Sequence, residues 1–491
     1  MSTVLRRHPA ARSRDSTVII SYSPQCPEQQ VATASQASAH DVAEAADHAR
    51  RAQRSWAGTP AEQRASVLSS VADAVATASA ELTDLVVTEV GKPCAEAAGE
   101  VQRTIALLRY YAQQALDPVG SVHEPTGPGL LYTRRRPLGL AGLITPWNFP
   151  LAIPVWKLAP ALAFGNAALL KPAPQAIGCA MRMSELFAAR LPDPALLQLL
   201  PGGAATGSAV VEHADAVSFT GSDAVGRTVV RNAATAGRRV QAEMGGQNPA
   251  IVLPDTDPIS VASMITGAAL TFAGQKCTAT RRVIAVGDPR ELRDALIAAV
   301  TELPWGDPAD PATVAGPVID ARACDIMSRA IDEARHAGGR ILVGGHRAES
   351  DGHFFSPTLV DGLPPEHPLT RREVFGPLLL LQHAASLDEA MTLANQTPFG
   401  LAASIHTNDL SAALEAADHL EAGQIRVNAP TTGAAVHTPF GGMKGSSYGE
   451  REQGKAAQHF YTSVHTVAVR GLRAPGTAQQ RMLSSERDHD T

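Results

Sequence analysis

The feature that most constrains this chain is a succession of short apolar runs, each closed by turn residues and separated by segments of helical periodicity. Three such runs lie at 139–144, 167–170 and 216–219, and a helical stretch at 176–190 separates two of them. Uniformly apolar runs of this length are typical of strands buried on both faces of a sheet. Strands that alternate with helices predict βαβ units, and therefore a parallel sheet with helices on both faces.

A second series of apolar runs begins after Glu243, at 250–253, 283–286, 341–343 and 378–381. The 491 residues are also too many for one compact core. We therefore predict an α/β fold with two doubly wound parallel-sheet domains. The first is expected to comprise residues 31–118, which are largely helical in pattern, together with 138–244, and the second to comprise 245–445.

Two segments outside these domains, 119–137 and 458–472, alternate polar and apolar residues as extended strands do. Long strands of this kind often pair between subunits, which predicts a small β oligomerisation extension and a homodimer or homotetramer. Residues 1–30 and 473–491 are expected to be tails. The arginines within the first fourteen residues lack an adjacent apolar segment, so a solvated tail is favoured over a targeting sequence.

Composition excludes several classes of function. The formal net charge of −6, without a basic stripe, argues against a nucleic-acid partner. No run of about 18 apolar residues occurs, so no membrane span is expected. The five cysteines are widely spaced and form no CxxC pair, which argues against a disulfide framework or a metal site and favours a reducing cytoplasm. A small-molecule substrate is the remaining expectation.

Three local patterns bear residues suited to chemistry. Cys277 follows Lys276, whose ammonium would favour the reactive thiolate. Glu243 comes two residues before a pair of glycines, where the backbone can bend freely. Asn148 follows a predicted parallel strand, at the sheet edge where ligands bind, and offers an amide donor for an oxyanion. Taken singly, each also fits an ordinary role: a small buried thiol, a solvated glutamate or a turn asparagine.

Together the patterns resemble the aldehyde dehydrogenase superfamily. Seven of its motifs occur in order, at Pro146–Pro150, Lys171-Pro172, Phe219–Ser222, Glu243–Gly246, Gly274–Cys277, Glu373–Pro377 and Pro439–Lys444. The glutamate and the cysteine are 34 positions apart, as the family requires. The resemblance covers roughly residues 30 to 472. It implies that the first domain binds the cofactor and that the second is catalytic.

The resemblance also implies roles for three residues. Cys277 attacks the aldehyde and forms a thiohemiacetal, then a thioester. The Asn148 amide and the Cys277 backbone N–H hold the oxyanion, and Glu243 activates the water that hydrolyses the thioester. Coenzyme A-dependent members of the superfamily typically lack this glutamate, so hydrolysis is favoured over acyl transfer. The expected function is NAD(P)+-dependent oxidation of an aldehyde to a carboxylic acid.

The resemblance implies NAD or NADP as the cofactor and assigns it Trp147, Lys171, Pro174, Gly221, Ser222, Glu373 and Phe375. The pyrophosphate is expected near Trp147 and Ser222, at the N-terminus of the helix that follows Gly221. Lys171 is expected at the adenosine ribose, and Glu373 and Phe375 at the nicotinamide ribose. Pro174 stands where many NAD-preferring members have a glutamate that repels a 2′-phosphate, so both cofactors stay open.

The expected substrate pocket contains Trp156, Lys276, Thr278, His437 and Phe440. The local sequence at 153–157, 275–280 and 444–449 resembles that of the 2-oxoglutarate semialdehyde dehydrogenases, whose substrate is a small aldehyde with an anionic end. Lys276 or His437 is a candidate partner for that anion. An equally weighted alternative is that Lys276 points to solvent and only tunes Cys277.

Two departures from the superfamily also bear on the pocket and the base. Thr271 and Trp156 stand where the succinic semialdehyde branch has arginines, which disfavours that simple specificity. Ser447 stands where many relatives have glycine.

Three other functions remain open at this point. One is a catalytically silent binding or structural protein with the same fold. Another is coenzyme A-dependent acylation, and a third is a dehydrogenase dedicated to a specialised biosynthetic aldehyde. Reduced-nicotinamide absorbance across a panel of aldehydes would separate the first of these from an active dehydrogenase.

Overall fold

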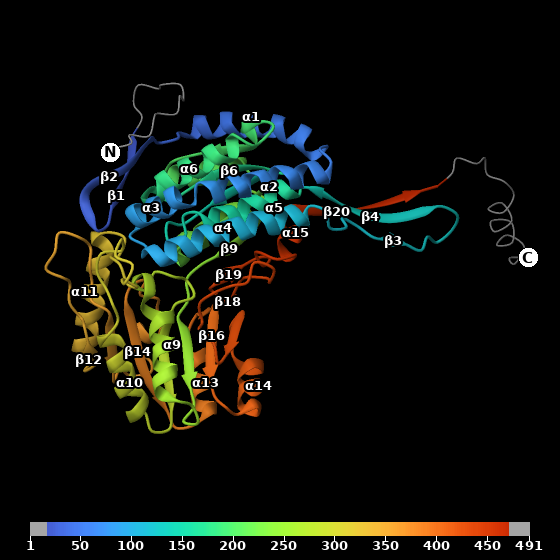
Figure 1. Ribbon diagram of the computed structural model, residues 1–491. Helices are drawn as coiled ribbons and strands as arrows, with labels where there is room; N and C mark the ends of the chain where they lie inside the picture. Colours follow the sequence, from blue (N-terminus) through green and yellow to red (C-terminus); the bar gives the residue numbers. More distant parts are fainter. Residues whose placement is uncertain (1–16, 471–491) are drawn as a thin grey trace, which may run out of the picture.

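The computed structural model describes residues 17–470, which form two α/β units and a projecting three-stranded arm (Figure 1). Each unit is built on its own sheet of mainly parallel strands. The predicted fold class, with two parallel-sheet α/β domains, is therefore confirmed.

The first unit contains a six-stranded sheet of order β19-β9-β8-β5-β6-β7. Its parallel strands are β5 (Leu140–Ile144), β6 (Ala167–Lys171), β7 (Leu197–Leu199), β8 (Ala216–Thr220) and β9 (Arg239–Glu243). The short β19 (Ser447–Tyr448) adds an antiparallel edge to β9. Every residue of β5, β6 and β8 is buried, as the uniformly apolar runs predict.

Helices cover both faces of this sheet. They are α1 (Ala39–Ala57), α2 (Ala61–Thr77), α3 (Ser79–Val90), α4 (Cys94–Gln114), α5 (Ala152–Ala163), α6 (Ile177–Ala188), α7 (Ala204–His213) and α8 (Asp223–Thr235). The apolar side chains of α1 to α5 and of the strands form one continuous core.

The second unit contains a seven-stranded sheet of order β12-β13-β14-β11-β10-β16-β17. Its strands are β10 (Asn248–Val252), β11 (Thr280–Val286), β12 (Arg340–Val343), β13 (Thr358–Asp361), β14 (Leu378–Ala384), β16 (Ala402–His406) and β17 (Gln424–Val427). The strand pairs are parallel except β12 with β13. Its main helices are α9 (Pro258–Leu270), α10 (Arg290–Thr301), α11 (Ala321–His336), α13 (Leu387–Asn395) and α14 (Leu410–His419).

The arm is a sheet of order β20-β4-β3, made of β3 (Val122–His123), β4 (Leu130–Pro137) and β20 (Thr462–Val469). It extends away from both units (Figure 1). The prediction that the second arm segment is extended from residue 458 is wrong for 458–461, which belong to α15 (Ala456–Tyr461). Those residues are helical because Phe460 and Tyr461 turn into the core of the first unit.

The prediction that residues 1–30 form a tail is wrong from Val18 onward. β1 (Val18–Ser23) and β2 (Cys26–Ser35) form an antiparallel hairpin. Ile19 and Ala32 bury against Ile177 of α6, which anchors the hairpin to the first unit. Residues 1–16, with the arginine-rich stretch, and the predicted tail at 473–491 lie outside the described residues.

Residues 17–470 lack two features that would indicate a membrane or a metal ion as a partner. No helix in this range combines the length and apolar character that a bilayer span requires. The same residues contain no group of three or more His, Cys, Asp or Glu side chains arranged to hold a metal ion.

Candidate active site

Cys277 lies in a loop of the second unit, and Asn148 of the first unit reaches that loop. The cysteine follows the 3₁₀ turn η3 (Thr271–Gly274) and precedes β11. Asn148 follows β5, is buried, and donates its amide Nδ2 to the Gln275 carbonyl at 3.0 Å. The predicted oxyanion donor and the predicted nucleophile are therefore brought to one place by a contact between the two units.

Backbone constraints hold the cysteine loop in shape. Phe272 and Ala273 have φ of 54° and 51°, a conformation that side-chain-bearing residues rarely adopt. Asn248, at the start of β10, donates its amide to the Cys277 carbonyl at 2.8 Å. Strained backbone of this kind persists only where surrounding contacts over-determine it, and it is common at active sites.

The surroundings of the Cys277 sulfur favour the neutral thiol. Burial first, and then the Glu373 and Glu243 carboxylates, raise the pKa of this thiol to about 12, and Arg281 opposes them. Cys277 nonetheless remains partly accessible. The expectation of a thiolate favoured by a neighbouring ammonium is wrong for this arrangement, because burial and two carboxylates outweigh the cations.

Lys276 has a different partner from the one expected. Its ammonium donates to Glu96 at 2.5 Å and to Thr271 at 2.7 Å. It is only 9% exposed, so the alternative in which Lys276 points to solvent is wrong. The charge of Lys276 is compensated by an internal carboxylate rather than held free for a substrate.

Glu243 ends β9 and is almost fully buried. The pKa of its carboxyl lies well above the usual range, first because of burial and then because of the nearby Glu452 carboxylate. The Ser447 hydroxyl, which donates to Glu243 Oε2 at 2.6 Å, and the Lys157 ammonium lower it. Lys157 and Glu452 form a buried ion pair that the sequence did not single out.

Two of the predicted pocket residues pack together as an apolar wall. The rings of Trp156 and Phe440 are buried, with centroids 5.4 Å apart. Thr278 is also buried, and its carbonyl accepts a hydrogen bond from the Thr431 hydroxyl at 2.7 Å. His437 lies on an exposed stretch of the loop that leads to Phe440.

Arg103 of α4 lies beside the predicted pocket residue Trp156, and sequence reasoning missed it. Its guanidinium carbon lies 5.9 Å from the centre of the Trp156 ring. The guanidinium donates to the Ala434 carbonyl and, at 2.9 Å, to Gln453 Oε1. The residue is half-buried; burial lowers the pKa of its guanidinium, and the negative charges of Glu100 and of an ionised Cys277 oppose this shift. A cation therefore stands beside the apolar wall and within electrostatic reach of the sulfur.

The signal for Arg103 is a polar stripe on α4. Glu96, Glu100 and Arg103 follow one another at spacings of four and three, which places them on one face of a helix. Glu96 holds Lys276, and Glu100 pairs with Lys92 while accepting the backbone N–H of Leu151 at 2.8 Å. Three polar residues on an otherwise buried face were the sign that α4 borders the site.

The residues expected at the adenosine ribose and the phosphates fit such a ligand. Lys171 donates to the carbonyls of Pro172 and Gly202 at 2.8 and 3.1 Å, which leaves one of its three N–H donors for a hydroxyl. Burial lowers the pKa of Lys171 to about 8. Ser222 caps α8 without a side-chain hydrogen bond to the helix, so its hydroxyl and the first N–H groups are available to a phosphate. Pro174, three residues after Lys171, begins a 3₁₀ turn and has no acceptor in its side chain.

Phe375, expected at the nicotinamide ribose, lies against Trp147, which is expected near the pyrophosphate. The rings of Trp147 and Phe375 meet edge-to-face at 5.7 Å. Glu373 accepts the Gly246 N–H at 3.3 Å, and burial raises the pKa of its carboxyl against the opposing charge of Arg281. Gly221 packs on the Phe219 ring, where a Cβ would lie 2.6 Å from a ring atom. These positions are compatible with a dinucleotide that runs along the strand ends toward Cys277.

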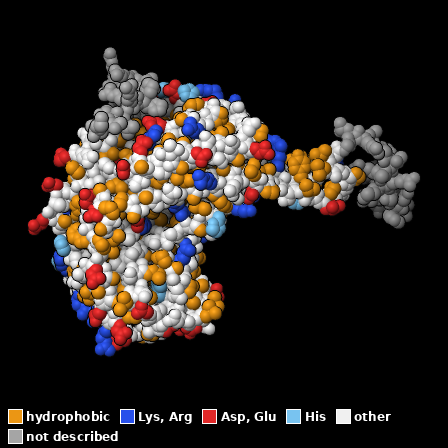
Figure 2. Space-filling model, in the orientation of Figure 1, with side chains coloured by type: hydrophobic (Ala, Val, Ile, Leu, Met, Phe, Trp, Pro, Cys, Tyr) orange, Lys and Arg blue, Asp and Glu red, His pale blue; other side chains and the backbone are white. Residues whose placement is uncertain are grey.

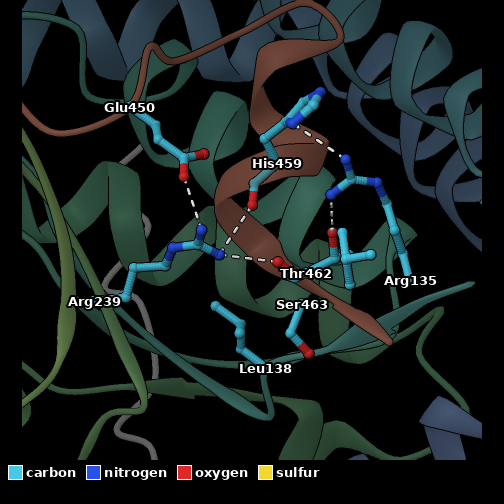
Figure 3. A pocket seen from close by; sticks show the side chains of 8 residues that line it. Arg135, Leu138, Arg239, Glu450, His459, Thr462 and Ser463 are labelled. Carbon is cyan, nitrogen blue, oxygen red and sulfur yellow. Dashed lines mark hydrogen bonds and ion pairs between the residues drawn. The ribbon is translucent and has the colours of Figure 1, made fainter. Parts of the chain in front are cut away.

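A cavity of about 460 Å³ lies elsewhere, at the base of the arm (Figure 3). Its charged groups are paired with one another: Arg239 donates to Glu450 at 2.8 Å and to the carbonyls of His459 and Thr462. Arg135 donates to the Thr462 hydroxyl at 3.2 Å. Because these cations already have partners, the cavity does not resemble a site for aldehyde chemistry.

Known proteins are similar to this chain over most of its length. A sequence profile of the aldehyde dehydrogenase family matches residues 11–467. An alpha-ketoglutaric semialdehyde dehydrogenase of Bacillus subtilis is 36% identical, over 88% of this chain and 90% of the relative. An alpha-ketoglutarate semialdehyde dehydrogenase of Haloferax volcanii is 38% identical, over 90% and 94%. The resemblance noted in the sequence is thereby confirmed.

A solved structure is similar in fold as well. Betaine aldehyde dehydrogenase of Staphylococcus aureus, in complex with NAD+, superposes with a TM-score of 0.90 at 28% identity. The match covers 94% of this chain and 93% of that protein. The arrangement of two parallel sheets and an arm is thus shared with a protein that binds a nicotinamide dinucleotide.

The charges around Cys277 generate the first prediction. Glu373→Gln removes a negative charge near the sulfur, so the thiol pKa should fall and alkylation by iodoacetamide at pH 8 should become about 10-fold faster, as expected for one pKa unit. In the unchanged protein the rate should keep rising between pH 7 and 10 without levelling. Mass spectrometry of the Cys277 peptide measures both rates, and the exposed Cys26 is the internal control. A rate for Glu373→Gln equal to that of the unchanged protein would contradict this account of the thiol.

Proposed function

This chain belongs to the aldehyde dehydrogenase family, and on that basis we propose how its residues act. The protein is an oxidoreductase that oxidises an aldehyde with NAD or NADP. We assign the chemistry to Cys277, Asn148 and Glu243. The observation that supports this assignment most directly is the hydrogen bond from the Asn148 amide to the loop that carries Cys277.

In the first half-reaction, the partly accessible Cys277 thiol gives its proton to solvent water, and its sulfur bonds to the carbonyl carbon of the aldehyde. The Asn148 amide and the Cys277 backbone N–H stabilise the oxyanion that forms. Bound NAD or NADP supplies an acceptor for the hydride, whose departure leaves a thioester on Cys277.

In the second half-reaction, Glu243 takes a proton from a water molecule as the water oxygen attacks the thioester carbon. Collapse of the tetrahedral species breaks the C–S bond, releases the carboxylic acid and returns Cys277. A buried glutamate with a raised pKa suits this role, because a general base works best when its pKa lies near the working pH. The intact set of three residues disfavours a catalytically silent protein.

For the substrate we propose a small aldehyde with an anionic tail. Trp156 and Phe440 provide an apolar wall for the carbon chain, and Arg103 is the cation beside that wall. Arg103 replaces Lys276 in this role, because the ammonium of Lys276 is already paired with Glu96. The names of the relatives, which include dehydrogenases of α-ketoglutarate semialdehyde, are consistent with such a substrate. A dedicated role toward one specialised biosynthetic aldehyde of this class is the alternative.

We further propose that the arm joins copies of this chain into a homodimer or homotetramer. β20 is an edge strand of the arm sheet, with eight residues paired to β4 on one side. Apolar side chains gather on the arm (Figure 2), and Val122, Leu130, Val464 and Val469 are exposed there. An exposed edge of this length favours pairing with another chain.

The five free cysteines, and the thiol that Cys277 requires, favour a reducing compartment such as the cytoplasm.

Aldehyde oxidation tests the proposed function directly. With a panel of aldehydes and either cofactor, the unchanged protein should produce reduced nicotinamide, measured by absorbance at saturating cofactor. Cys277→Ala should abolish the signal, and Asn148→Ala should reduce kcat about 100-fold or more, as the loss of one oxyanion donor does. Cofactor binding should persist in both variants. Unimpaired turnover by Cys277→Ala would overturn the assignment.

Arg103 generates a prediction about specificity. Arg103→Met should raise KM for semialdehydes of dicarboxylic acids about 10- to 100-fold, the equivalent of one charge-assisted hydrogen bond of about 1.5–3 kcal/mol. KM for neutral aldehydes such as butanal should stay within about 2-fold, because the apolar wall remains. Arg109→Met is the matched control, since Arg109 lies on the same helix but pairs at the surface with Asp73. Equal effects of Arg103→Met on acidic and neutral aldehydes would contradict the proposal.

The arm generates a prediction about assembly. Light scattering should give two or four times the chain mass of 51.3 kDa. Val464→Asp places a charge on the exposed edge and should shift the measured mass toward that of a single chain. Ile259→Asp, at a similarly exposed apolar position on α9 away from the arm, should leave the assembly unchanged. A single-chain mass for the unchanged protein would rule the proposal out.

A further inference from the structure

Ser447 lies directly opposite Glu243. The two residues are register partners where β19 pairs with β9. The Ser447 hydroxyl donates to Glu243 Oε2 at 2.6 Å, and the same hydroxyl oxygen accepts the Gly442 N–H at 2.6 Å. Because the backbone N–H occupies one side of the hydroxyl oxygen, the hydroxyl proton is directed at the carboxylate.

The two oxygens of Glu243 have different surroundings. Oε2 holds the Ser447 hydroxyl, the one hydrogen bond that the described residues give this carboxylate. Oε1 lies beside Gly441, where a Cβ would come within 2.8 Å of it. Lys157 does not substitute for Ser447, because its ammonium donates to Glu452 and to the Ser218 hydroxyl. One carboxylate oxygen is therefore anchored and the other is left to accept a proton.

We propose that Ser447 is a positioning residue for thioester hydrolysis, which holds Oε2 of Glu243 so that Oε1 takes the proton of the attacking water. This inference rests on the proposed function. In the step, the water O–H bond breaks and its proton goes to Oε1, while the water oxygen bonds to the acyl carbon. The C–S bond then breaks, and Cys277 leaves as the thiolate with the electron pair.

The same hydrogen bond affects the charge of Glu243. Burial and the Glu452 carboxylate favour the protonated form, and the Ser447 donor, the Lys157 ammonium and the Arg451 guanidinium lower the carboxyl pKa against them. Removing the hydroxyl should therefore raise this pKa. A base acts only when deprotonated, so the acid limb of the hydrolysis rate should move to higher pH when Ser447 is lost.

The lifetime of the acyl-enzyme tests the inference. The full chain is mixed with aldehyde and cofactor, quenched in acid, and weighed by mass spectrometry to follow the thioester on Cys277. In Ser447→Ala the thioester should persist about 10-fold longer at pH 7, and the acid limb of its decay should shift upward. The initial burst of reduced nicotinamide should not become slower. Ser447→Thr, which keeps a hydroxyl, should restore most of the decay rate.

A neighbouring serine controls for general loosening of this segment. Ser446 donates to the Gly245 carbonyl rather than to Glu243, so Ser446→Ala should leave the acid limb where it is. Thioester decay in Ser447→Ala at the unchanged rate and pH dependence, or an equal shift in Ser446→Ala, would overturn the role of Ser447 alone. Absence of any burst and of any thioester in the unchanged protein would instead overturn the proposed function.

Discussion

The hydrogen bond from the Asn148 amide to the Gln275 carbonyl joins the two α/β units at the reactive cysteine. Both groups are buried, and a buried donor or acceptor without a partner costs about 1–3 kcal/mol. This cost ties the loop after β5 to the loop before β11, so that neither sheet edge is a complete site alone. Asn248 pins the other side of the cysteine loop. The positions of Cys277 and its oxyanion donor follow from these two amides.

Paired charges surround this junction. Lys92 pairs with Glu100, Lys157 with Glu452, and Lys276 with Glu96. Burial of a charge is tolerated when a partner and further hydrogen bonds compensate it, and breaking one partner leaves an uncompensated charge. Each of these three lysines is balanced by a glutamate. As a result, burial and the carboxylates of Glu373 and Glu243 are the main influences on the pKa of the Cys277 thiol. The neutral thiol is the resting form, and Arg103 is a partly exposed cation beside the Trp156 ring.

Much of this arrangement could be predicted from the sequence, because motifs that follow parallel strands must meet at one sheet edge. Asn148 was predicted by that rule, whereas Lys171 and Ser222 were assigned from the resemblance to the aldehyde dehydrogenase superfamily. Contacts that depend on packing between distant segments were not predictable. The hairpin at 18–35 is ordered because Ile177 of α6 covers it, and nothing in its own composition indicates that partner. Lys276 was misjudged because Glu96 lies 180 positions away, and Arg103 was missed because the face that α4 presents is set by the fold.

The central claim is that Cys277 carries the acyl group and that Glu243 is required to remove it. The most direct measurement is the intact mass of Glu243→Gln after one turnover with aldehyde and cofactor. The account predicts one acyl group per chain, located on the Cys277 peptide and long-lived, with one equivalent of reduced nicotinamide released. An unmodified chain after the same yield of reduced nicotinamide, or an acyl group on another residue, would contradict it.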